Sequence, residues 1–193
     1  MADDPSLSSY YVGDAFYEAL VESFSDWQGD DRESRDPALR ETCRMALERE
    51  ARLLDAWRLE DWLAMFAPEC LYWVPATAGG GDPRREVAVA FDDRRRLEDR
   101  IFRLGTGHAW SQRPRSRTAR SISNVEVFTT DEEAVVMVRS AFLTVEHQAG
   151  ETRLWAGWNG HRLCWSGADW QILVKQVNLI DCDRNLRNPS IVL

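Results

Sequence analysis

The last third of the chain carries three long apolar runs that are separated by short turn signals. The runs cover residues 133–146, 152–165 and 170–181 and are rich in Val, Ile, Leu, Trp and Phe. Ala149-Gly150-Glu151 and Ser166-Gly167-Ala168 lie between them, and such short glycine-containing segments favour hairpin turns. The pattern predicts three long antiparallel strands that follow one another as a meander.

The first 57 residues have apolar positions at helical spacing instead. A first amphipathic helix is expected over residues 14–27, with Phe16, Leu20, Phe24 and Trp27 on one face. Asp36 and Pro37 then mark the start of a second helix that runs to about residue 57, since a carboxylate cap and a proline in the first turn favour helix initiation. The residues it is expected to bury are Leu39, Cys43, Ala46, Leu47, Leu54 and Trp57.

Shorter elements are expected between the second helix and residue 105. A short helix near residues 60–66 ends before Pro68, and short strands at 71–74 and 87–91 flank the flexible loop Gly79-Gly80-Gly81. Helices that precede a long antiparallel sheet indicate an α+β fold rather than a doubly wound one. We expect an N-terminal extension over residues 1–35 and a single domain over residues 36–193.

A further helix is expected to begin at Asp92 or Asp93, whose carboxylates can accept backbone N–H groups. Its apolar face carries Leu97, Ile101 and Leu104, and Gly105 is expected to end it in the left-handed conformation.

The run over residues 133–146 is apolar on both faces of its predicted strand. A sheet with one face in water should alternate apolar and polar residues. Here Val136, Val138 and Phe142 share one parity, and the other parity carries Val135, Met137, Ala141, Leu143 and Val145. We therefore expect one face to pack on the helices and the other on a second chain.

Four arginines fall within eight residues after the predicted fourth helix. Trp110 precedes them, Pro114 interrupts them and a strand-like run over residues 122–127 follows; the arginines are Arg113, Arg115, Arg117 and Arg120. An irregular loop is expected, in which some guanidinium groups bind carboxylates of another subunit beside Trp110, because the planar fork of arginine can hold a carboxylate through two hydrogen bonds. The alternative is a solvated loop.

Net charge, the N-terminal sequence and cysteine usage limit the partners and the cellular compartment that we expect for the protein. A formal net charge of −8 argues against nucleic acid and anionic membranes as partners. The start MADDPSLSSYYVGD lacks the cationic and apolar regions of a signal peptide, and no apolar run reaches the length of a membrane span. Cys43, Cys70, Cys164 and Cys182 show no short paired spacing, which favours free buried thiols in a reducing cytoplasm.

Metal ligands are scarce in this sequence. A Rieske cluster requires Cys-x-His and Cys-x-x-His pairs, and none of the four cysteines has a histidine at either spacing. His108, His147 and His161 are the histidines of the chain. A hairpin turn at Gly150 would place His147 and His161 more than about 20 Å apart, too far for one metal ion. We expect no redox centre in this chain.

Several blocks of the sequence together resemble a known family. They are the helix, arginine-rich segment and strand over residues 92–127, together with Glu50-Ala51-Arg52-Leu53-Leu54-Asp55, Trp62-Leu63, Leu71-Tyr72-Trp73-Val74-Pro75, Val177-Asn178-Leu179-Ile180-Asp181 and Asn188-Pro189-Ser190-Ile191-Val192-Leu193. In this order and spacing they resemble the small (β) subunit of Rieske-type aromatic-ring-hydroxylating dioxygenases, over roughly residues 48–193. The resemblance implies the cone-like fold shared with nuclear transport factor 2 and scytalone dehydratase, in which a curved, mainly antiparallel sheet wraps around helices.

The same resemblance implies a structural role without catalytic or metal-binding residues in this chain. The large (α) subunit would carry the Rieske [2Fe-2S] cluster, the mononuclear Fe(II) and most of the substrate pocket, and a ferredoxin and reductase would supply electrons. Assemblies of this family commonly contain three large and three small subunits. The oxygenase would add oxygen to an aromatic compound during catabolism, and the sequence of this chain does not name that compound.

Two other functions are compatible with a cone-like fold. A dehydratase, cyclase or isomerase would use a pocket acid or base, and its candidate residues here are Asp55, Asp61, Tyr72, Trp73 and His161. A standalone ligand-binding module explains neither the arginine segment nor the second apolar face. Because a fold alone does not define a function, the matched blocks favour the small subunit.

Overall fold

The computed structural model describes residues 13–106, 109–184 and 191–193. His108 and the first three residues of the C-terminal block, Asn188, Pro189 and Ser190, therefore lie outside the described residues. In chain order the elements are α1 (Asp14–Ser23), α2 (Pro37–Asp55), α3 (Leu59–Leu63), β1 (Phe66–Pro75), β2 (Ala88–Asp93), α4 (Arg94–Gly105), the short 3-10 helix η2 (Trp110–Gln112), β3 (Arg117–Thr129), β4 (Val135–Gln148), β5 (Glu151–Trp165) and β6 (Trp170–Leu179).

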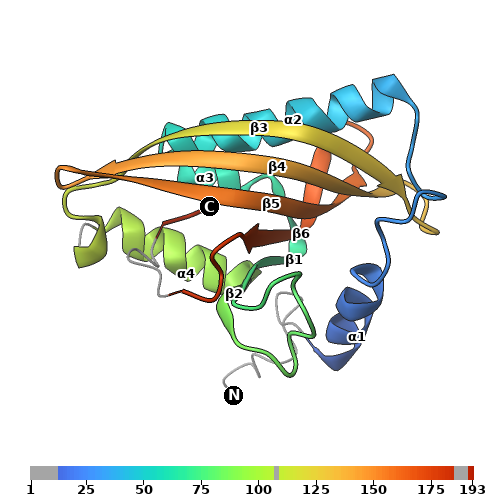
Figure 1. Cartoon of the computed structure of the whole chain (residues 1–193), viewed down its shortest axis with the longest axis horizontal. Helices are drawn as coiled ribbons and strands as arrows, with labels where there is room; N and C mark the ends of the chain where they lie inside the picture. The colour runs from blue at the N-terminus through green and yellow to red at the C-terminus, as the bar shows by residue number, and fades with distance from the viewer. Residues whose placement is uncertain (1–12, 107–108, 185–190) are drawn as a thin grey trace, which may run out of the picture.

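The strands form one curved sheet in the order β2-β1-β6-β5-β4-β3. Strand β1 runs parallel to β6, and the other neighbouring strands are antiparallel. The predicted meander of β4, β5 and β6 is confirmed, with Ala149, Gly150 and Gly167 at positive φ in its turns. Figure 1 shows the three longest strands crossing the molecule, with α2 running along β3. This is the α+β cone-like architecture that the sequence predicts.

Both predicted helix caps are present. The Asp36 carboxylate accepts the Ala38 N–H at 2.8 Å, and the Asp93 carboxylate accepts the Arg96 N–H at 2.9 Å, so each satisfies a backbone donor that the first turn leaves open. The expected left-handed end at Gly105 is wrong. Gly105 is the last residue of α4, and Thr106 follows it with φ −69° while its N–H binds Phe102 O.

Three other expected boundaries differ from the structure. Helix α1 ends at Ser23, so Trp27 lies beyond it, and α3 ends at Leu63. Strand β1 already begins at Phe66 and passes through Pro68. The β1–β6 register shifts between Phe66 and Leu71, which places Pro68 in an irregular stretch where a missing N–H interrupts no ladder bond.

The helices α2, α3 and α4 cover the concave face of the sheet. The main core contains Leu47 and Leu54 from α2, Leu97 and Ile101 from α4, and the inward residues of the strands, among them Val136, Val138 and Phe142. Ala46 and Trp57, which we expected in the core, are only half-buried, whereas Glu50 is buried.

The N-terminal segment covers part of the opposite face. Leu20 of α1 packs with Leu71, Trp73 and Val174, and Trp27 packs with Phe128 and Met137. Backbone bonds from Ser34 N to Val127 O and from Thr129 N to Arg32 O, both 2.8 Å, fasten the end of the segment to β3. This segment, rather than a second chain, covers Met137.

The rest of that outer face stays open. Leu143 and Val145 of β4 are 42% and 38% exposed, and Leu154 of β5 is 63% exposed. Val145 and Leu154 are direct cross-strand partners, and Ala119 of β3 is the partner of Val145 on the other side. We call Leu143, Val145 and Leu154 the outer apolar strip.

Arg120 ties β3 to the end of α2 and to the C-terminal residues. Its backbone N–H binds the Asp55 carboxylate at 2.9 Å, its guanidinium binds the same carboxylate at 2.5 Å, and Nη2 donates to Val192 O. Thr118 Oγ1 donates to Asp55 Oδ1 at 2.8 Å. The Arg120 side chain is 6% exposed, so this contact is an internal fastening.

Replacing Arg120 with Met should destabilise the chain by about 3 kcal/mol, because it leaves the Asp55 carboxylate without its cation in a largely desolvated place. Arg117→Met is the matched control: that arginine is exposed at the start of the same strand, and its loss should cost under about 1 kcal/mol. Urea unfolding of both variants measures the difference. Equal losses would show that Arg120 is not a structural fastening.

Candidate functional site

The interior of the cone holds a cluster of charged and aromatic side chains. Glu50 of α2 accepts hydrogen bonds at Oε1 from Lys175 Nζ at 2.8 Å and from Trp62 Nε1 at 2.9 Å. His161 Nε2 lies 3.1 Å from Glu50 Oε2. All four residues are at most 3% exposed. One carboxylate therefore links α2, α3, β5 and β6.

Strand register brings the two basic side chains of this cluster together. His161 of β5 and Lys175 of β6 are direct cross-strand partners, and both project towards the helices. Glu50 lies on the same helical face as Leu47 and Leu54, three and four residues away, so the apolar face of α2 carries it inward. Its position on the apolar face of α2 was the sequence feature that could have indicated a buried Glu50. We did not propose Glu50 as a site residue.

The cluster shifts the pKa values of its members. Burial by itself raises the pKa of Glu50, but the neighbouring Lys175 and His161 outweigh it and hold that pKa below its usual range. Burial lowers the pKa of His161 and of Lys175, and Glu50 opposes both shifts only in part. Because an ionised carboxylate only accepts hydrogen bonds, His161 must donate from Nε2, which leaves its Nδ1 as an acceptor.

This arrangement is better suited to holding the helices and strands together than to acid–base catalysis. A general base works best with a pKa near the working pH, whereas the pKa of Glu50 is lowered and both of its oxygens accept hydrogen bonds. Within the described part of the chain, His161 Nδ1, Asn159 Oδ1 and Ser140 Oγ are buried without a hydrogen-bond partner. These atoms lie on the inner face of β4 and β5, where a small donor such as a water molecule would satisfy them.

The five residues that we considered for a pocket enzyme do not form one site. Asp55 binds Arg120, and Asp61 forms an exposed ion pair with Arg58 at 2.7 Å. Trp73 packs on the outer face with α1. Tyr72 lies in the interior, where its hydroxyl accepts the Leu193 N–H at 3.1 Å and burial raises its pKa to about 12. His161 alone belongs to the interior cluster.

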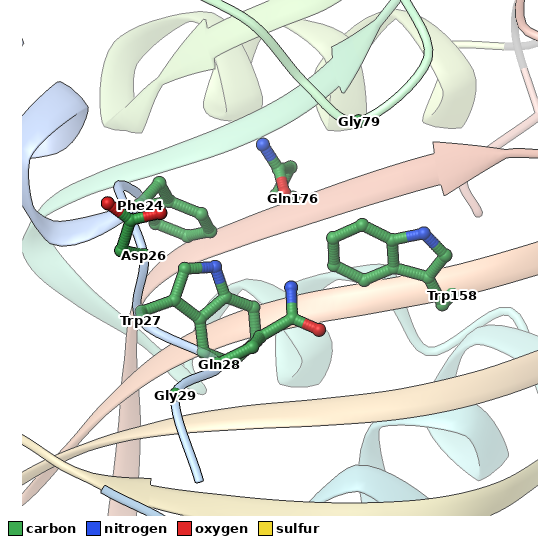
Figure 2. Close-up of a pocket in the computed structure, with 8 residues that line it drawn as sticks. All are labelled: Phe24, Asp26, Trp27, Gln28, Gly29, Gly79, Trp158 and Gln176. Carbon is green, nitrogen blue, oxygen red and sulfur yellow. The ribbon is translucent and has the colours of Figure 1, made fainter. Parts of the chain in front are cut away.

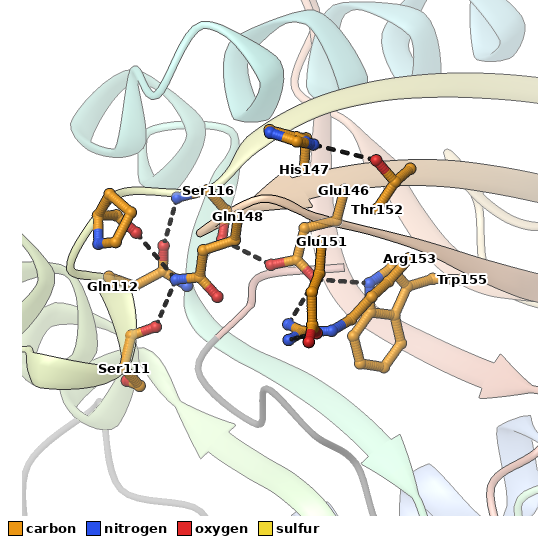
Figure 3. A network of polar contacts seen from close by, with 11 residues as sticks. Ser111, Gln112, Ser116, Glu146, His147, Gln148, Glu151, Thr152, Arg153 and Trp155 are labelled. Atoms are coloured by element: carbon orange, nitrogen blue, oxygen red, sulfur yellow. Dashed lines mark hydrogen bonds and ion pairs between the residues drawn. The ribbon is translucent and has the colours of Figure 1, made fainter.

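The arginine-rich segment is shorter and more ordered than expected. Regular structure resumes at Arg117, and the preceding residues are fixed to the end of the β4–β5 hairpin (Figure 3). Gln148 Nε2 donates to Ser111 O at 2.7 Å and to Pro114 O at 2.9 Å. Ser116 Oγ donates to the fully buried Glu146 carboxylate at 2.5 Å.

The four arginines of this segment have different surroundings. Arg113 stacks on Trp110 with 5.3 Å between guanidinium carbon and ring centroid, and Arg115 stacks on Trp57 at 5.1 Å. Arg117 is exposed at the start of β3, and Trp110 is 78% exposed. Arg120 is bound internally, contrary to the expectation that the segment could not satisfy its arginines within the chain. The other three are presented at the surface.

The described residues offer no metal centre. Among residues 13–106, 109–184 and 191–193, no three His, Cys, Asp or Glu side chains come together as metal ligands. His147 pairs with Thr152, nine positions along β5 from His161, which corresponds to about 30 Å at 3.3 Å per residue. The four cysteines are free, and burial raises the pKa of Cys43 and Cys70 to about 12, so both stay protonated thiols.

None of the helices in the described ranges has both the length and the apolar character needed to cross a bilayer.

The interior cluster predicts a pH-dependent stability. The folded state keeps His161 neutral while the unfolded chain protonates it, so the free energy of unfolding should fall as the pH drops below about 6.5, by at most about 1.4 kcal/mol per pH unit. The lowered pKa of Glu50 acts in the same direction below about pH 4.5. His161→Gln should flatten the decline that begins below about pH 6.5 in urea unfolding, whereas His147→Gln should retain it. An unchanged slope in His161→Gln would contradict the assignment.

Comparison with known proteins places this geometry in a family. The chain is 38% identical over 122 residues to the small oxygenase component of the p-cumate 2,3-dioxygenase system of Pseudomonas putida, an alignment that covers 61% of this chain and 66%, just under two thirds, of that protein. It is 33% identical over 135 residues to the benzoate 1,2-dioxygenase subunit beta of Acinetobacter baylyi, covering 67% of this chain and 79% of that protein.

Solved structures agree on the fold. The benzoate 1,2-dioxygenase beta subunit of Burkholderia mallei superposes with a TM-score of 0.65 at 24% identity, covering 82% of this chain and 99% of that one. A candidate scytalone dehydratase from Novosphingobium aromaticivorans gives a TM-score of 0.57 at 14% identity, covering 78% and 91%. Residues 49–183 match the family described as the ring hydroxylating beta subunit. The chain therefore belongs to the family of ring-hydroxylating beta subunits.

Proposed function

We propose that this chain is the structural small subunit of a multicomponent oxygenase that adds oxygen to an aromatic compound. The observation that carries this proposal is the family match over residues 49–183. The Glu50 cluster adds support. Both carboxylate oxygens of Glu50 are hydrogen-bonded to Lys175, Trp62 and His161, so among the described residues the interior of the cone holds no carboxylate that is free to act as a general base in this cluster. A standalone dehydratase, cyclase or isomerase has no comparable support.

In this proposal the redox chemistry belongs to a large subunit, which carries the Rieske [2Fe-2S] cluster and the mononuclear Fe(II). The sequence of this chain does not fit a Rieske cluster, since no cysteine is followed by a histidine at the required spacing. His147 and His161 lie too far apart along β5 to share one Fe(II) ion. Three large and three small subunits would assemble in the cytoplasm, with electrons delivered by a ferredoxin and reductase. The relatives are named for p-cumate, benzoate, 2-halobenzoate and toluate, which favours an aromatic carboxylate as the substrate of the complex.

The surface that suits the partner is the outer apolar strip with its basic border. Three apolar side chains from neighbouring strands are open to solvent here, and contiguous exposed apolar side chains bordered by polar residues are typical of protein–protein contact sites. Arg117 lies on the same face, because it is two residues before Ala119 on β3 and alternate residues of a strand share a face. Trp110, Arg113 and Arg115 are exposed on the segment that Gln148 binds to the hairpin end, and Arg115 stacks on Trp57 just after α2. Tryptophan and arginine are enriched where protein interfaces bind most tightly.

Leu154→Asp should prevent or strongly weaken association with the large subunit, because it places a charge at the most exposed residue of the strip, while the exposed position should leave the fold intact. Arg117→Ala should weaken association by about 2 kcal/mol or more if its partner carboxylate is desolvated. Val87→Asp is the matched control, at an apolar residue that is 79% exposed elsewhere. Co-purification and size-exclusion chromatography measure the complex. Full association of Leu154→Asp would exclude this surface.

The purified chain without its partner should contain no stoichiometric iron and show no oxygenase activity. Metal analysis and the visible absorption spectrum test this directly, with the co-expressed complex as the positive control. Iron in the isolated chain, or an iron–sulfur absorption band, would contradict the proposed division of labour between the subunits.

A further inference from the structure

A pocket lies between the N-terminal segment and the outer face of the sheet. Its Trp158 pairs with Ala141, two positions along β4 from Leu143 of the outer apolar strip. The volume of the pocket is about 430 Å³, within the range of small-molecule sites. Figure 2 shows Phe24, Asp26 and Trp27 on one side, Trp158 of β5 on the other, Gln176 of β6 behind them and the Gly79 loop above.

Three of the eight described lining residues are aromatic, namely Phe24, Trp27 and Trp158. Phe24 and Trp27 meet edge to face with centroids 6.0 Å apart, and Trp27 and Trp158 lie 6.4 Å apart with a tilt of 41°. Arg139 already stacks on Trp158 at 5.2 Å, so one ring of this set binds a cation within the fold itself. Such rings favour a planar aromatic guest in offset or edge-to-face contact, and they attract positive charge through their faces.

Two glycines shape the pocket. A Cβ atom at Gly160 would lie 3.1 Å from the Phe24 ring, 3.3 Å from the Trp27 ring and 3.4 Å from Gln176 Oε1, so the absence of a side chain there lets these three groups converge. Gly80, at φ +97°, passes so close to Gln176 that a Cβ would be 2.4 Å from Nε2. These two glycines do not line the pocket themselves, but they let the lining residues Phe24, Trp27 and Gln176 take their positions.

The polar groups of the pocket define which ligands fit. Gln176 is 2% exposed, and its Oε1 accepts a hydrogen bond from Asn178 Nδ2 at 2.9 Å, which orients the amide. Asn178 Oδ1, beside it, is buried without a partner among the described residues. Asp26 supplies the charge among the described lining residues, and none of them is basic. Arg139, which stacks on Trp158, is paired with Glu126 at 3.4 Å, so its charge is largely balanced and Asp26 disfavours a bound carboxylate.

We propose that this pocket binds an uncharged or positively charged aromatic compound that carries a hydroxyl or amino group, and that it rejects aromatic carboxylates. Its selectivity thus differs from the carboxylate-bearing compounds for which the relatives are named. Phe24, Asp26 and Trp27 precede residue 49, where the family match begins, so one wall of the pocket belongs to a segment outside that match. The inference is independent of the proposed oxygenase role.

Calorimetric titration of the full chain with benzylamine, benzyl alcohol, cyclohexylmethylamine and benzoate tests the proposal. Benzylamine and benzyl alcohol should bind. Cyclohexylmethylamine and benzoate should bind at least about tenfold more weakly, because the first has a saturated ring in place of the aromatic one and the second carries the wrong charge. Benzoate binding as tightly as benzylamine, or no binding of either favoured probe at millimolar concentration, would overturn the proposal.

Variants locate the binding. Trp158→Leu should weaken both favoured probes about tenfold, while Trp110→Leu, at an exposed tryptophan far from the pocket, should change neither. Asp26→Asn should weaken benzylamine about threefold to fivefold and leave benzyl alcohol unchanged. Asn tolerates the positive φ of Asp26 (+50°), so this variant remains informative if Trp158→Leu fails to fold. Equal effects of the Trp158 and Trp110 variants, or of Asp26→Asn on both probes, would place the binding elsewhere.

Discussion

The buried Glu50 carboxylate is the interaction on which the arrangement of the cone depends. Moving a carboxylate and an ammonium group out of water costs several kcal/mol each, and only close pairing with additional hydrogen bonds offsets that cost. Glu50 meets this requirement only when Lys175, His161 and Trp62 are all in place. The rotation of α2, the position of α3 and the β5–β6 register are therefore coupled. The same saturation explains why an interior with a histidine and a carboxylate is a poor acid–base site.

The two faces of the sheet are covered by different parts of the chain. Helices α2, α3 and α4 fill the concave face, and the N-terminal segment covers one half of the outer face through Leu20 and Trp27. The other half ends in the outer apolar strip beside Arg117. This division separates two surfaces with different chemistry: an aromatic pocket in the covered half, and an open apolar area with a basic border in the other.

In the arginine segment, the position of each arginine along β3 determines which face of the sheet its side chain occupies. Arg117 and Arg120 lie three positions apart on β3, so they point to opposite faces. Arg120 points inward, where the end of α2 supplies the Asp55 carboxylate, and it becomes a fastening. Arg117 points outward and stays available to a partner. The interface prediction is thus reduced to Arg113, Arg115, Arg117 and Trp110, and it stays a prediction.

Local sequence determined the elements of this protein: Asp36 and Asp93 cap their helices, and the glycine turns produce the β4–β5–β6 meander, because these signals act over a few residues. The order of blocks along the chain also identified the family. Contacts between distant residues could not be predicted in this way. Glu50 lies 111 positions from His161 and 125 from Lys175, and a single glutamate on a helix is ordinarily solvated. Only the tertiary structure decided that it is buried, that Trp27 lies over β3 and β4, and that Arg120 points inward, because each depends on which surfaces the folded sheet brings together.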